Sequence, residues 1–409
     1  MKITKILFLV ILLIISLPEQ LSPVQGFIPN DPVGDPWHLN TIKIHSVWDH
    51  GYNFQSTSGA VGLCVIGFAI TDDQNGDLNV TERASFAWNN DFTSYLAYPN
   101  VATSSHEAAV ASVAASTINN GIGVAGIVNA PLYSAWPWGN FPNDEIDYYH
   151  VYMQMLINIF DWCTGFGKMV FTMSFIDYLH DLEITDPVLI ELQNKVSSLY
   201  ESGQALFFAA SANSLFQFEY KDIPQSLPYV RVVGRINREG LYESGGYGEN
   251  EFLVAPAGGV PVYDQTSGGY GTFGGASCSA PIVAASAVLL WNQFPWSSNA
   301  QIEDALVWGA TDILDPGWDE KSGFGILNVE KARAYLVDNI PSSNSYSLNW
   351  TATTGESFHT TSSLTNNSGE SIYTTTSSIN AGDIFFATTS LIILTVSIKR
   401  RKTSKPGKN

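Results

Sequence analysis

The sequence predicts an α/β domain in which a mostly parallel central sheet carries helices on both faces. Continuous apolar runs of strand length alternate along the chain with longer segments of helical periodicity. Alternating β and α segments form parallel sheets, because each helix returns the chain across the sheet before the next strand begins. At 409 residues with 45% hydrophobic content, the chain has ample material for one large core.

The first residues are typical of a secretory signal. Lys2 and Lys5 precede an apolar run over 6–17, and a polar stretch containing two prolines follows. The run is too short for a membrane-spanning helix, so we expect residues 1–26 to direct export. We expect the globular domain to occupy residues 35–340.

Within this domain the expected strands are uninterrupted apolar runs, as in strands covered on both faces. They lie at 61–70, 168–175, 205–210 and 229–234, with two shorter extended segments at 124–128 and 132–136. The expected helices are rich in Ala and Val or amphipathic. They lie at 104–115, 146–162, 187–200 and 300–308. Ser298 and Gln301 predict a capping box at the start of the last helix.

The composition changes after residue 340 to Ser, Thr and Asn with almost no aliphatic side chains. This change predicts a disordered stalk over 341–383. Residues 384–398 are apolar, and a basic cluster follows directly. The pattern favours a C-terminal membrane anchor with a basic cytoplasmic tail over 399–409. The segment is shorter than the ~20 residues that cross a bilayer comfortably, so an apolar tail that does not span remains the alternative.

The charge distribution argues against nucleic acid as a partner. The formal net charge is −19, and eight of the 19 basic residues lie within positions 1–5 and 399–409. The part between them is therefore still more acidic, and it repels phosphate groups. The three cysteines, Cys64, Cys163 and Cys278, show no metal-ligand spacing and are too few for a disulfide scaffold. One bridge is possible without a defined pairing, and we expect no metal and no cofactor.

The segment over 275–290 is the strongest candidate for a functional site. A turn of small residues presents Ser277 and continues into a helix that is apolar on nearly every face. Such a helix belongs in the interior, and Pro281 suits its first turn. Ser277 is then expected just before the helix N-terminus, where free N–H groups favour negative charge. That setting suits a nucleophile whose reaction develops an oxyanion. The alternative is a turn that caps an ordinary core helix.

Several segments, taken in chain order, resemble the subtilisin-like serine proteases (subtilases). They include a lead-in over 37–48, VIGFAI at 65–70, HEAAVA at 106–111, AASAN at 209–213 and GASCSAP at 275–281. The resemblance covers about residues 35–335. It implies a three-layer subtilisin-like fold and the hydrolysis of peptide bonds.

The resemblance also implies a role for each matched residue. Ser277 is the nucleophile, His106 is the general base, and Asn213 with the Ser277 backbone N–H stabilises the oxyanion. Ser174 and Phe175 lie where the family lines its primary specificity pocket. Ile176 and Asp177, which follow them, replace small residues of the family pattern, so the shape and charge preference of the pocket are open.

One position departs sharply from the family pattern. Gly67 stands where the family has its catalytic Asp, and glycine offers no acceptor to orient an imidazole. Asp72 and Asp73 follow in the next loop and are candidate substitutes. Glu107 is expected to point away from the His106 ring, because neighbours on a helix diverge by about 100°. On this basis Gly67→Asp is expected to raise peptide hydrolysis.

Cys278, beside the nucleophile, is expected to serve packing, although a reactive thiol is the alternative. The leading hypothesis is an exported, surface-anchored serine endopeptidase whose activity is lowered or rewired by the loss of the Asp. The rival is a catalytically inactive subtilase fold that binds proteins at the cell surface, and a third hypothesis is an unrelated secreted α/β domain. The partners are accordingly a polypeptide substrate or a protein ligand, and the membrane through the C-terminal segment.

Overall fold

The computed structural model describes residues 26–67, 70, 76–88, 95–98, 104–137, 145–178, 183–218, 222–340, 347–351, 357–365 and 371–380. The chain separates into two compact units after Ile340. The expected signal segment, apart from Gly26, and the expected membrane anchor lie outside the described residues. Among the helices that are described, none is both long and apolar enough to cross a membrane.

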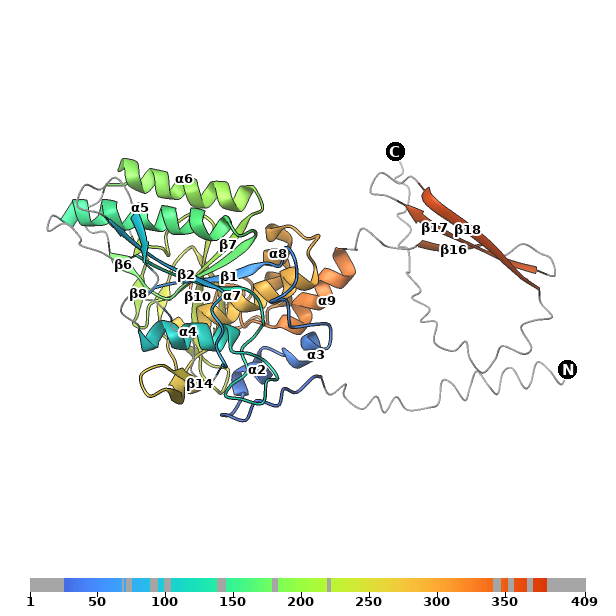
Figure 1. Cartoon of the computed structure of the whole chain (residues 1–409), viewed down its shortest axis with the longest axis horizontal. Helices are drawn as coiled ribbons and strands as arrows, with labels where there is room; N and C mark the ends of the chain where they lie inside the picture. Colours follow the sequence, from blue (N-terminus) through green and yellow to red (C-terminus); the bar gives the residue numbers. More distant parts are fainter. Residues whose placement is uncertain are drawn as a thin grey trace. The chain divides into compact units, whose positions relative to one another are not determined.

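The first unit is built around a central sheet of nine strands, with helices in a layer on each side (Figure 1). Eight strands follow one another in the order β11-β10-β7-β5-β1-β4-β2-β3, and β13 pairs with β10. In chain order they are β1 (Gly62–Ile66), β2 (Glu82–Trp88), β3 (Tyr95–Tyr98), β4 (Leu132–Pro137), β5 (Met169–Met173), β7 (Ala205–Ala210), β10 (Val230–Ile236), β11 (Tyr242–Glu243) and β13 (Glu251–Pro256).

The sheet is mostly parallel, as the sequence predicts. β1 pairs in parallel with β4 and β5, and the parallel pairing continues through β7 and β10 to β13. β2 is parallel to β4, and only the pairings of the outer strands β3 and β11 are antiparallel. The residues at 124–128, expected to be extended, form no strand, and the chain there runs as a loop toward β4.

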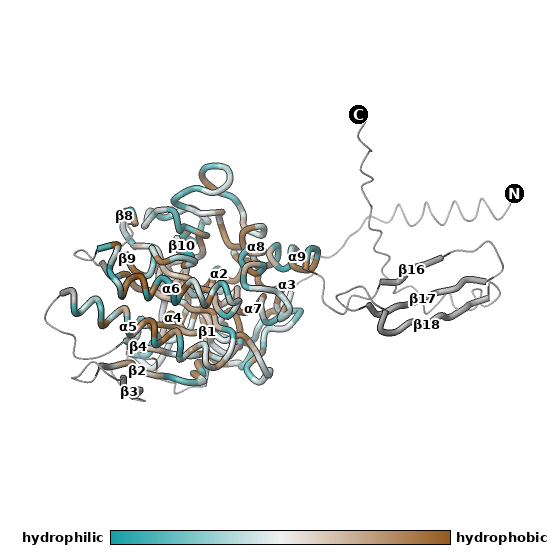
Figure 2. The backbone as a smooth tube through the Cα atoms, turned by 90° about the horizontal axis from the view of Figure 1, so that it is seen from above, coloured by the Kyte–Doolittle hydropathy of each residue, from teal (hydrophilic) through white to brown (hydrophobic). Residues whose placement is uncertain are grey.

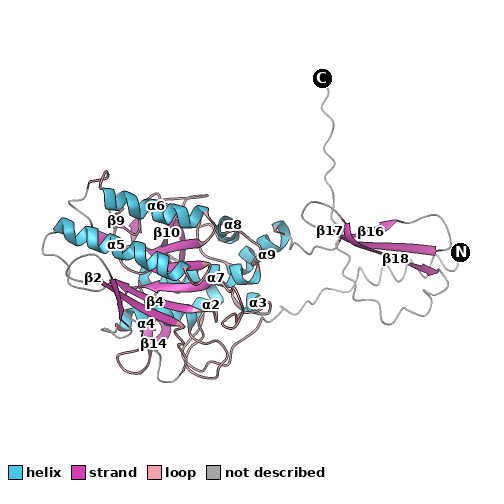
Figure 3. Ribbon diagram, turned by 45° about the horizontal axis from the view of Figure 1, so that its top comes forward, coloured by secondary structure: helices cyan, strands magenta, loops and turns pink. Residues whose placement is uncertain are grey.

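Two pairs of helices cover the two faces of the sheet (Figure 3). α5 (Glu145–Thr164) and α6 (Pro187–Glu201) pack together on one face. α4 (Ser105–Ala115) and α7 (Ala276–Gln293) pack together on the other. All four are predicted by the sequence to within a few residues. The three-layer α/β architecture is therefore confirmed.

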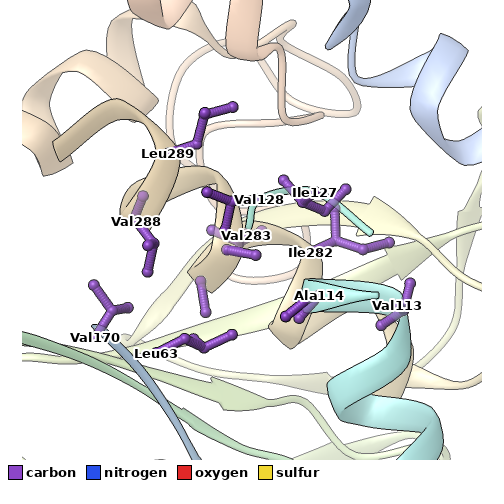
Figure 4. Packing of buried hydrophobic residues seen from close by; sticks show 14 of the residues in the cluster. Leu63, Val113, Ala114, Ile127, Val128, Val170, Ile282, Val283, Val288 and Leu289 are labelled. Atoms are coloured by element: carbon purple, nitrogen blue, oxygen red, sulfur yellow. The ribbon is translucent and has the colours of Figure 1, made fainter. Parts of the chain in front are cut away.

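The alternation of side chains along β1 divides the core in two. Leu63 and Val65 belong to the cluster around α4 and α7, whereas Cys64 and Ile66 belong to the cluster around α5 and α6. Successive side chains of a strand point to opposite faces, so a strand covered on both sides must be apolar throughout. Figure 4 shows Leu63 on the sheet beside the apolar side chains of α7. In Figure 2 the hydrophobic residues concentrate in the interior of this unit.

Further elements complete the first unit. The helices are α2 (Trp37–Thr41), α3 (His45–Trp48), α8 (Asn299–Gly309) and α9 (Val329–Asn339). The short strands pair as β6 (Asp177–Tyr178) with β9 (Asp222–Ile223), β8 (Phe216–Gln217) with β12 (Gly246–Tyr247), and β14 (Val260–Asp264) with β15 (Gly269–Phe273). The predicted capping box at α8 is present in full, since the Ser298 and Gln301 side chains each accept from the other residue's backbone N–H.

The second unit differs from the expectation for the stalk. Its described residues form an antiparallel sheet of β16 (Ser347–Thr351), β17 (Ser357–Thr365) and β18 (Ser371–Asn380). The sequence predicts disorder here because aliphatic residues are scarce. Thr is nevertheless a good strand former, since its branched side chain suits a pleated surface.

Candidate active site

Ser277 lies in the first turn of α7, the helix against which much of the core packs. The sequence predicts that Ser277 lies just before the helix. The helix instead begins at Ala276, so Ser277 is its second residue. Gly275 precedes the helix with φ +78°, a conformation that L side chains rarely adopt. The left-handed turn allows the helix to start earlier than Pro281 suggests. Ser277 is half-buried.

Pro281 lies inside α7 and not in its first turn, which corrects the prediction. A proline lacks the N–H that would bond the carbonyl four residues earlier, and here that carbonyl belongs to Ser277. The Ser174 hydroxyl donates to this freed carbonyl at 3.0 Å. In return, the Ser277 hydroxyl faces the Ser174 carbonyl at 3.5 Å. The proline thus leaves an acceptor that ties the segment around Ser277 to the chain leaving β5.

Asn213 is fixed against the same helix start. Its Oδ1 accepts from the Ala276 backbone N–H at 2.9 Å and from Arg235 Nη1 at 3.3 Å. A Cβ at Gly275 would lie 2.8 Å from this oxygen, so only glycine allows the approach. Within the described residues the Asn213 Nδ2 has no hydrogen-bond partner, and the residue is exposed. Its two N–H groups are therefore available to an incoming group beside Ser277.

Arg235 is a residue of the site that carries no signal in the sequence. Its guanidinium donates to the Asn213 carbonyl at 3.0 Å and to the Ser244 carbonyl at 2.8 Å, besides the contact with Oδ1. These bonds hold both the backbone and the side chain of Asn213. No local pattern marks Arg235, because its contact with Asn213 is made only when β7 and β10 pair.

His106 is the second residue of α4 and lies at the start of the helix, as the sequence predicts. The Ser104 hydroxyl caps the helix by accepting from the His106 backbone N–H at 3.1 Å. The Phe273 ring packs against the imidazole in a T-shaped arrangement, with 5.4 Å between the centroids and 80° between the planes. The side chain of His106 is 40% exposed, and its Nε2 has no hydrogen-bond partner among the described residues. This nitrogen is free to accept a proton.

The Glu107 carboxylate contacts the neighbouring imidazole, contrary to the sequence prediction. The distance from Glu107 Oε1 to His106 Nδ1 is 2.9 Å. The 100° divergence holds at the Cα atoms, but a glutamate has enough rotatable bonds to turn back along the helix end. The space it enters lies beside Gly67, where an added Cβ would lie 2.6 Å from Glu107 Cγ and 2.8 Å from Oε1. Asp72 and Asp73, the other candidate acids, lie outside the described residues.

The candidate residues gather at one edge of the sheet. Gly67 follows β1, Ser174 follows β5, and Asn213 lies three residues beyond the end of β7. These three strands are parallel neighbours, so their carboxyl ends share an edge. Ligands of open parallel sheets bind outside this edge. α4 and α7 bring His106 and Ser277 to it, although no hydrogen bond joins these two side chains in the described part of the chain.

The chain beyond Ser174 carries larger groups than the family pattern. The Phe175 ring packs edge-on against Tyr152 of α5. The carbonyl of Phe175 accepts from Gln225 Nε2 at 2.8 Å, and the same nitrogen donates to the Ala210 carbonyl. Burial raises the pKa of the Asp177 carboxyl. The hydrogen bond that this carboxyl accepts from the Tyr152 hydroxyl opposes the shift without cancelling it. Asp177 is thus engaged with α5.

Cys278 is a packing residue, as expected. It has no exposed surface, and burial raises the pKa of its thiol. Only the thiolate is nucleophilic, so a thiol held neutral in the interior is inert. The other two cysteines, Cys64 and Cys163, are also free and buried, and their Sγ atoms are in hydrogen-bond contact at 2.6 Å between β1 and the end of α5.

Comparison with known proteins agrees with this geometry. Residues 51–325 match the family model described as the subtilase family. Subtilisin E of Bacillus subtilis is 28% identical over 73% of this chain and 71% of its own length. Subtilisin of Bacillus pumilus is also 28% identical, over 73% of this chain and 98% of its own length. The crystal structure of MycP1 from Mycobacterium smegmatis superposes with a TM-score of 0.58, at 18% identity, over 76% of this chain and 87% of that one. The chain belongs to the subtilase family.

Proposed function

We propose that this protein is a serine endopeptidase that hydrolyses peptide bonds with Ser277 as nucleophile and His106 as general base. The observation that supports the proposal most directly is the setting of Asn213. Its amide oxygen is bound to Ala276 and Arg235, and its NH₂ group is left free beside the nucleophile. Such a fixed, unoccupied donor stabilises an oxyanion without reorganising during the reaction.

The reaction follows from the positions of these groups. The Ser277 hydroxyl attacks the substrate carbonyl while His106 Nε2 takes up its proton. The negative charge that develops on the carbonyl oxygen is bound by the Asn213 NH₂ and the Ser277 backbone N–H. The imidazolium then protonates the leaving amine and an acyl-enzyme forms. Water, deprotonated by the same imidazole, releases the acid and restores Ser277.

The helix start adds a favourable field for this charge. The first N–H groups of α7 have no partners within the helix, and the helix dipole places positive potential there. Ser277 is the second residue of α7, so its own N–H is among these groups. Oxyanion binding by backbone and side-chain donors together is worth several kcal/mol, since removing one such donor typically costs ~10²–10³ in kcat.

An inactive binding protein is the second candidate function, and Gly67 is the observation in its favour. Without an acceptor at this position, an imidazole loses the group that selects its tautomer, at a cost of roughly 10⁴ in kcat in related triads. The protein would then retain the fold and bind peptide segments at this edge of the sheet without cleaving them.

A fluorophosphonate probe separates the two candidates, because it reacts only with an activated serine. The purified chain is exposed to the probe between pH 6 and pH 10, with Ser277→Ala as control. We expect labelling that Ser277→Ala abolishes. Absence of labelling in the parent chain across this range, with the fold intact by circular dichroism, would exclude the endopeptidase and leave the binding protein.

We further propose that the protein acts outside the cell, held at the membrane by its C-terminal segment. The apolar run after two lysines at the start of the chain supports export. The apolar residues 384–398 followed by a basic cluster support an anchor with the domain outside. Fractionation tests this, since truncation after residue 383 should release the protein into the medium. Retention of the truncated chain with the membranes would refute the anchor.

A further inference from the structure

The side chain of Glu107 lies in the space that a side chain at position 67 would otherwise fill. A Cβ at position 67 would meet Cγ, Oε1 and Cδ of Glu107 at 2.6, 2.8 and 3.0 Å. All three distances are at or below what real Cβ atoms show, so the glutamate side chain occupies the volume that any side chain at 67 would enter. The absence of a side chain at Gly67 and the conformation of Glu107 are therefore one feature of the packing.

We propose that Glu107 is the positioning residue for His106 and takes the part of the acid that Gly67 cannot supply. This inference rests on the proposed endopeptidase function and goes beyond it by completing the triad with an acid adjacent in sequence to the base. Glu107 does not touch the substrate. It acts on the reaction through the imidazole.

The contact determines which nitrogen of His106 carries the proton. Glu107 Oε1 lies 2.9 Å from Nδ1. A carboxylate only accepts hydrogen bonds, so the neutral imidazole keeps its proton on Nδ1 and presents the lone pair of Nε2. Nε2 is the nitrogen that has no partner among the described residues and that must accept the proton of Ser277. The Phe273 ring contacts the imidazole as well and restricts its rotation.

The burial of Glu107 makes the contact sensitive to charge. Its side chain is 7% exposed, and its Oε2 has no hydrogen-bond partner in the described part of the chain. Within that part no Lys or Arg pairs with it, and its contact with a basic side chain is the one with His106 Nδ1. A buried carboxylate gains most when a positive charge appears beside it. Formation of the imidazolium during the attack of Ser277 therefore strengthens the pair, which is the differential binding that accelerates a reaction.

Glu107 does not make the capping hydrogen bond that is common for a glutamate at its position in a helix. It is the third residue of α4 after the cap Ser104, where a glutamate usually bonds back to the backbone N–H of the cap residue. α8 makes this reciprocal bond through Gln301, whereas Glu107 makes none to Ser104 and is directed to His106 instead. A structural role as a cap does not account for the orientation.

The test is a carboxylate exchange between positions 67 and 107, measured as kcat/KM on a peptide substrate. Glu107→Gln keeps the size of the side chain and removes its charge, and we expect a loss of about 10³–10⁴. Gly67→Asp alone should not raise activity, because its side chain can enter this space only by displacing the Glu107 carboxylate, so that one acid replaces another. Gly67→Asp combined with Glu107→Gly should recover at least a hundredfold over Glu107→Gly, since the carboxylate is returned to the same space.

The pH profile and a matched control exclude a merely structural effect. Loss of the carboxylate makes the imidazole a weaker base, so Glu107→Gln should move the acid limb of the kcat/KM profile to lower pH. The control is Glu330→Gln, which removes a carboxylate from the first turn of α9, where it accepts from the Ser46 hydroxyl. This control should leave both kcat/KM and its profile unchanged.

A readout that does not depend on turnover separates this inference from the proposed function. In the Ser277→Ala chain, ¹⁵N NMR of His106 should show the Nδ1–H tautomer, and Glu107→Gln should change the tautomer ratio. If the fluorophosphonate probe does not label the parent chain but the NMR shows this tautomer, the endopeptidase proposal fails and the positioning role stands. The positioning role would be overturned if the probe labels the parent chain while Glu107→Gln keeps full activity and an unchanged His106 spectrum. A gain of activity in Gly67→Asp alone would overturn it as well.

Discussion

Acid should destabilise the first unit through His38, a histidine buried in the short helix α2. Its side chain is 1% exposed, and neither ring nitrogen has a hydrogen-bond partner among the described residues. It lines a cavity of about 60 Å³ together with Asp31 and His45. Burial, and to a lesser extent the charge of His45, lowers the pKa of His38 from 6.5 to about 3. The folded protein thus holds this imidazole neutral.

The size of the effect follows from the difference between the two pKa values. Below pH 6.5 the unfolded chain binds a proton at His38 that the folded chain rejects until about pH 3. Above pH 6.5 the titration of His38 therefore costs no stability. Between pH 6.5 and pH 3 it lowers the free energy of unfolding by about 1.4 kcal/mol for each pH unit. The loss is about 3 kcal/mol at pH 4.5 and about 5 kcal/mol once pH 3 is passed. Domains of this kind are stable by only about 5–15 kcal/mol, so the change is large.

The measurement compares two chains that both carry Ser277→Ala, so that neither can digest itself. Urea unfolding at pH 7.5 and pH 4.5 is followed for this parent and for the same chain with His38→Phe, which keeps a ring and removes the titrating nitrogens. We expect the parent to lose about 3 kcal/mol more than His38→Phe between the two pH values. The carboxylates of the rest of the chain contribute equally to both proteins and cancel. Substitution of the exposed His50 by Phe is the control and should change the difference little. Parallel losses in the parent and in His38→Phe would refute the assignment.

Three further substitutions test other parts of the structure. Asn213→Ala should lower kcat by ~10²–10³ with little change in KM, because a transition-state donor is lost, and equal effects on both constants would contradict this role. Glu251 is buried, and its carboxyl pKa is raised well above the usual value, chiefly by desolvation. Stability therefore declines as the pH rises from the ordinary pKa of a glutamate toward this raised pKa. Glu251→Gln should accordingly be more stable than the parent at pH 8, with the gap closing toward pH 4 in urea unfolding; an equal gap at both pH values would show that charge is not the cause. Glu303 accepts two hydrogen bonds from the Arg231 guanidinium, at 3.0 and 3.1 Å, and its loss leaves a half-buried cation without this partner. Glu303→Ala should cost roughly 2–3 kcal/mol of unfolding free energy, whereas Asp304→Ala beside it should cost less than 1.

Much of the fold could be predicted because the relevant signals are local. Apolar runs predict the strands β1, β5, β7 and β10, since a parallel strand covered on both faces needs no polar alternation. The helices α4 to α8 follow from periodicity and caps. The predictions were wrong where two local signals competed. Pro281 is a strong marker of a first helical turn, yet Gly275, with its left-handed conformation, starts the helix earlier.

The candidate site was predictable in part for the same reason. Ser277, His106 and Asn213 each stand in a recognisable local segment, and their common location follows from the parallel order of the strands. Arg235 carries no such signal, because its role arises only where β10 lies beside β7. Helix geometry predicts only the direction of the Glu107 Cα–Cβ bond, and it does not predict the space that Gly67 leaves after β1, which the rest of the side chain enters.

The sequence by itself determines the class of this protein: an α/β subtilase domain with a serine, a histidine and an asparagine in the order of that family, and no aspartate at position 67. Tertiary structure alone decides whether that absence leaves the imidazole without an acid. Periodicity and propensity act between neighbours in the chain, whereas the volume open to the Glu107 carboxylate is bounded by a strand and a helix about forty residues apart. In that volume the carboxylate meets Nδ1 of His106 at 2.9 Å.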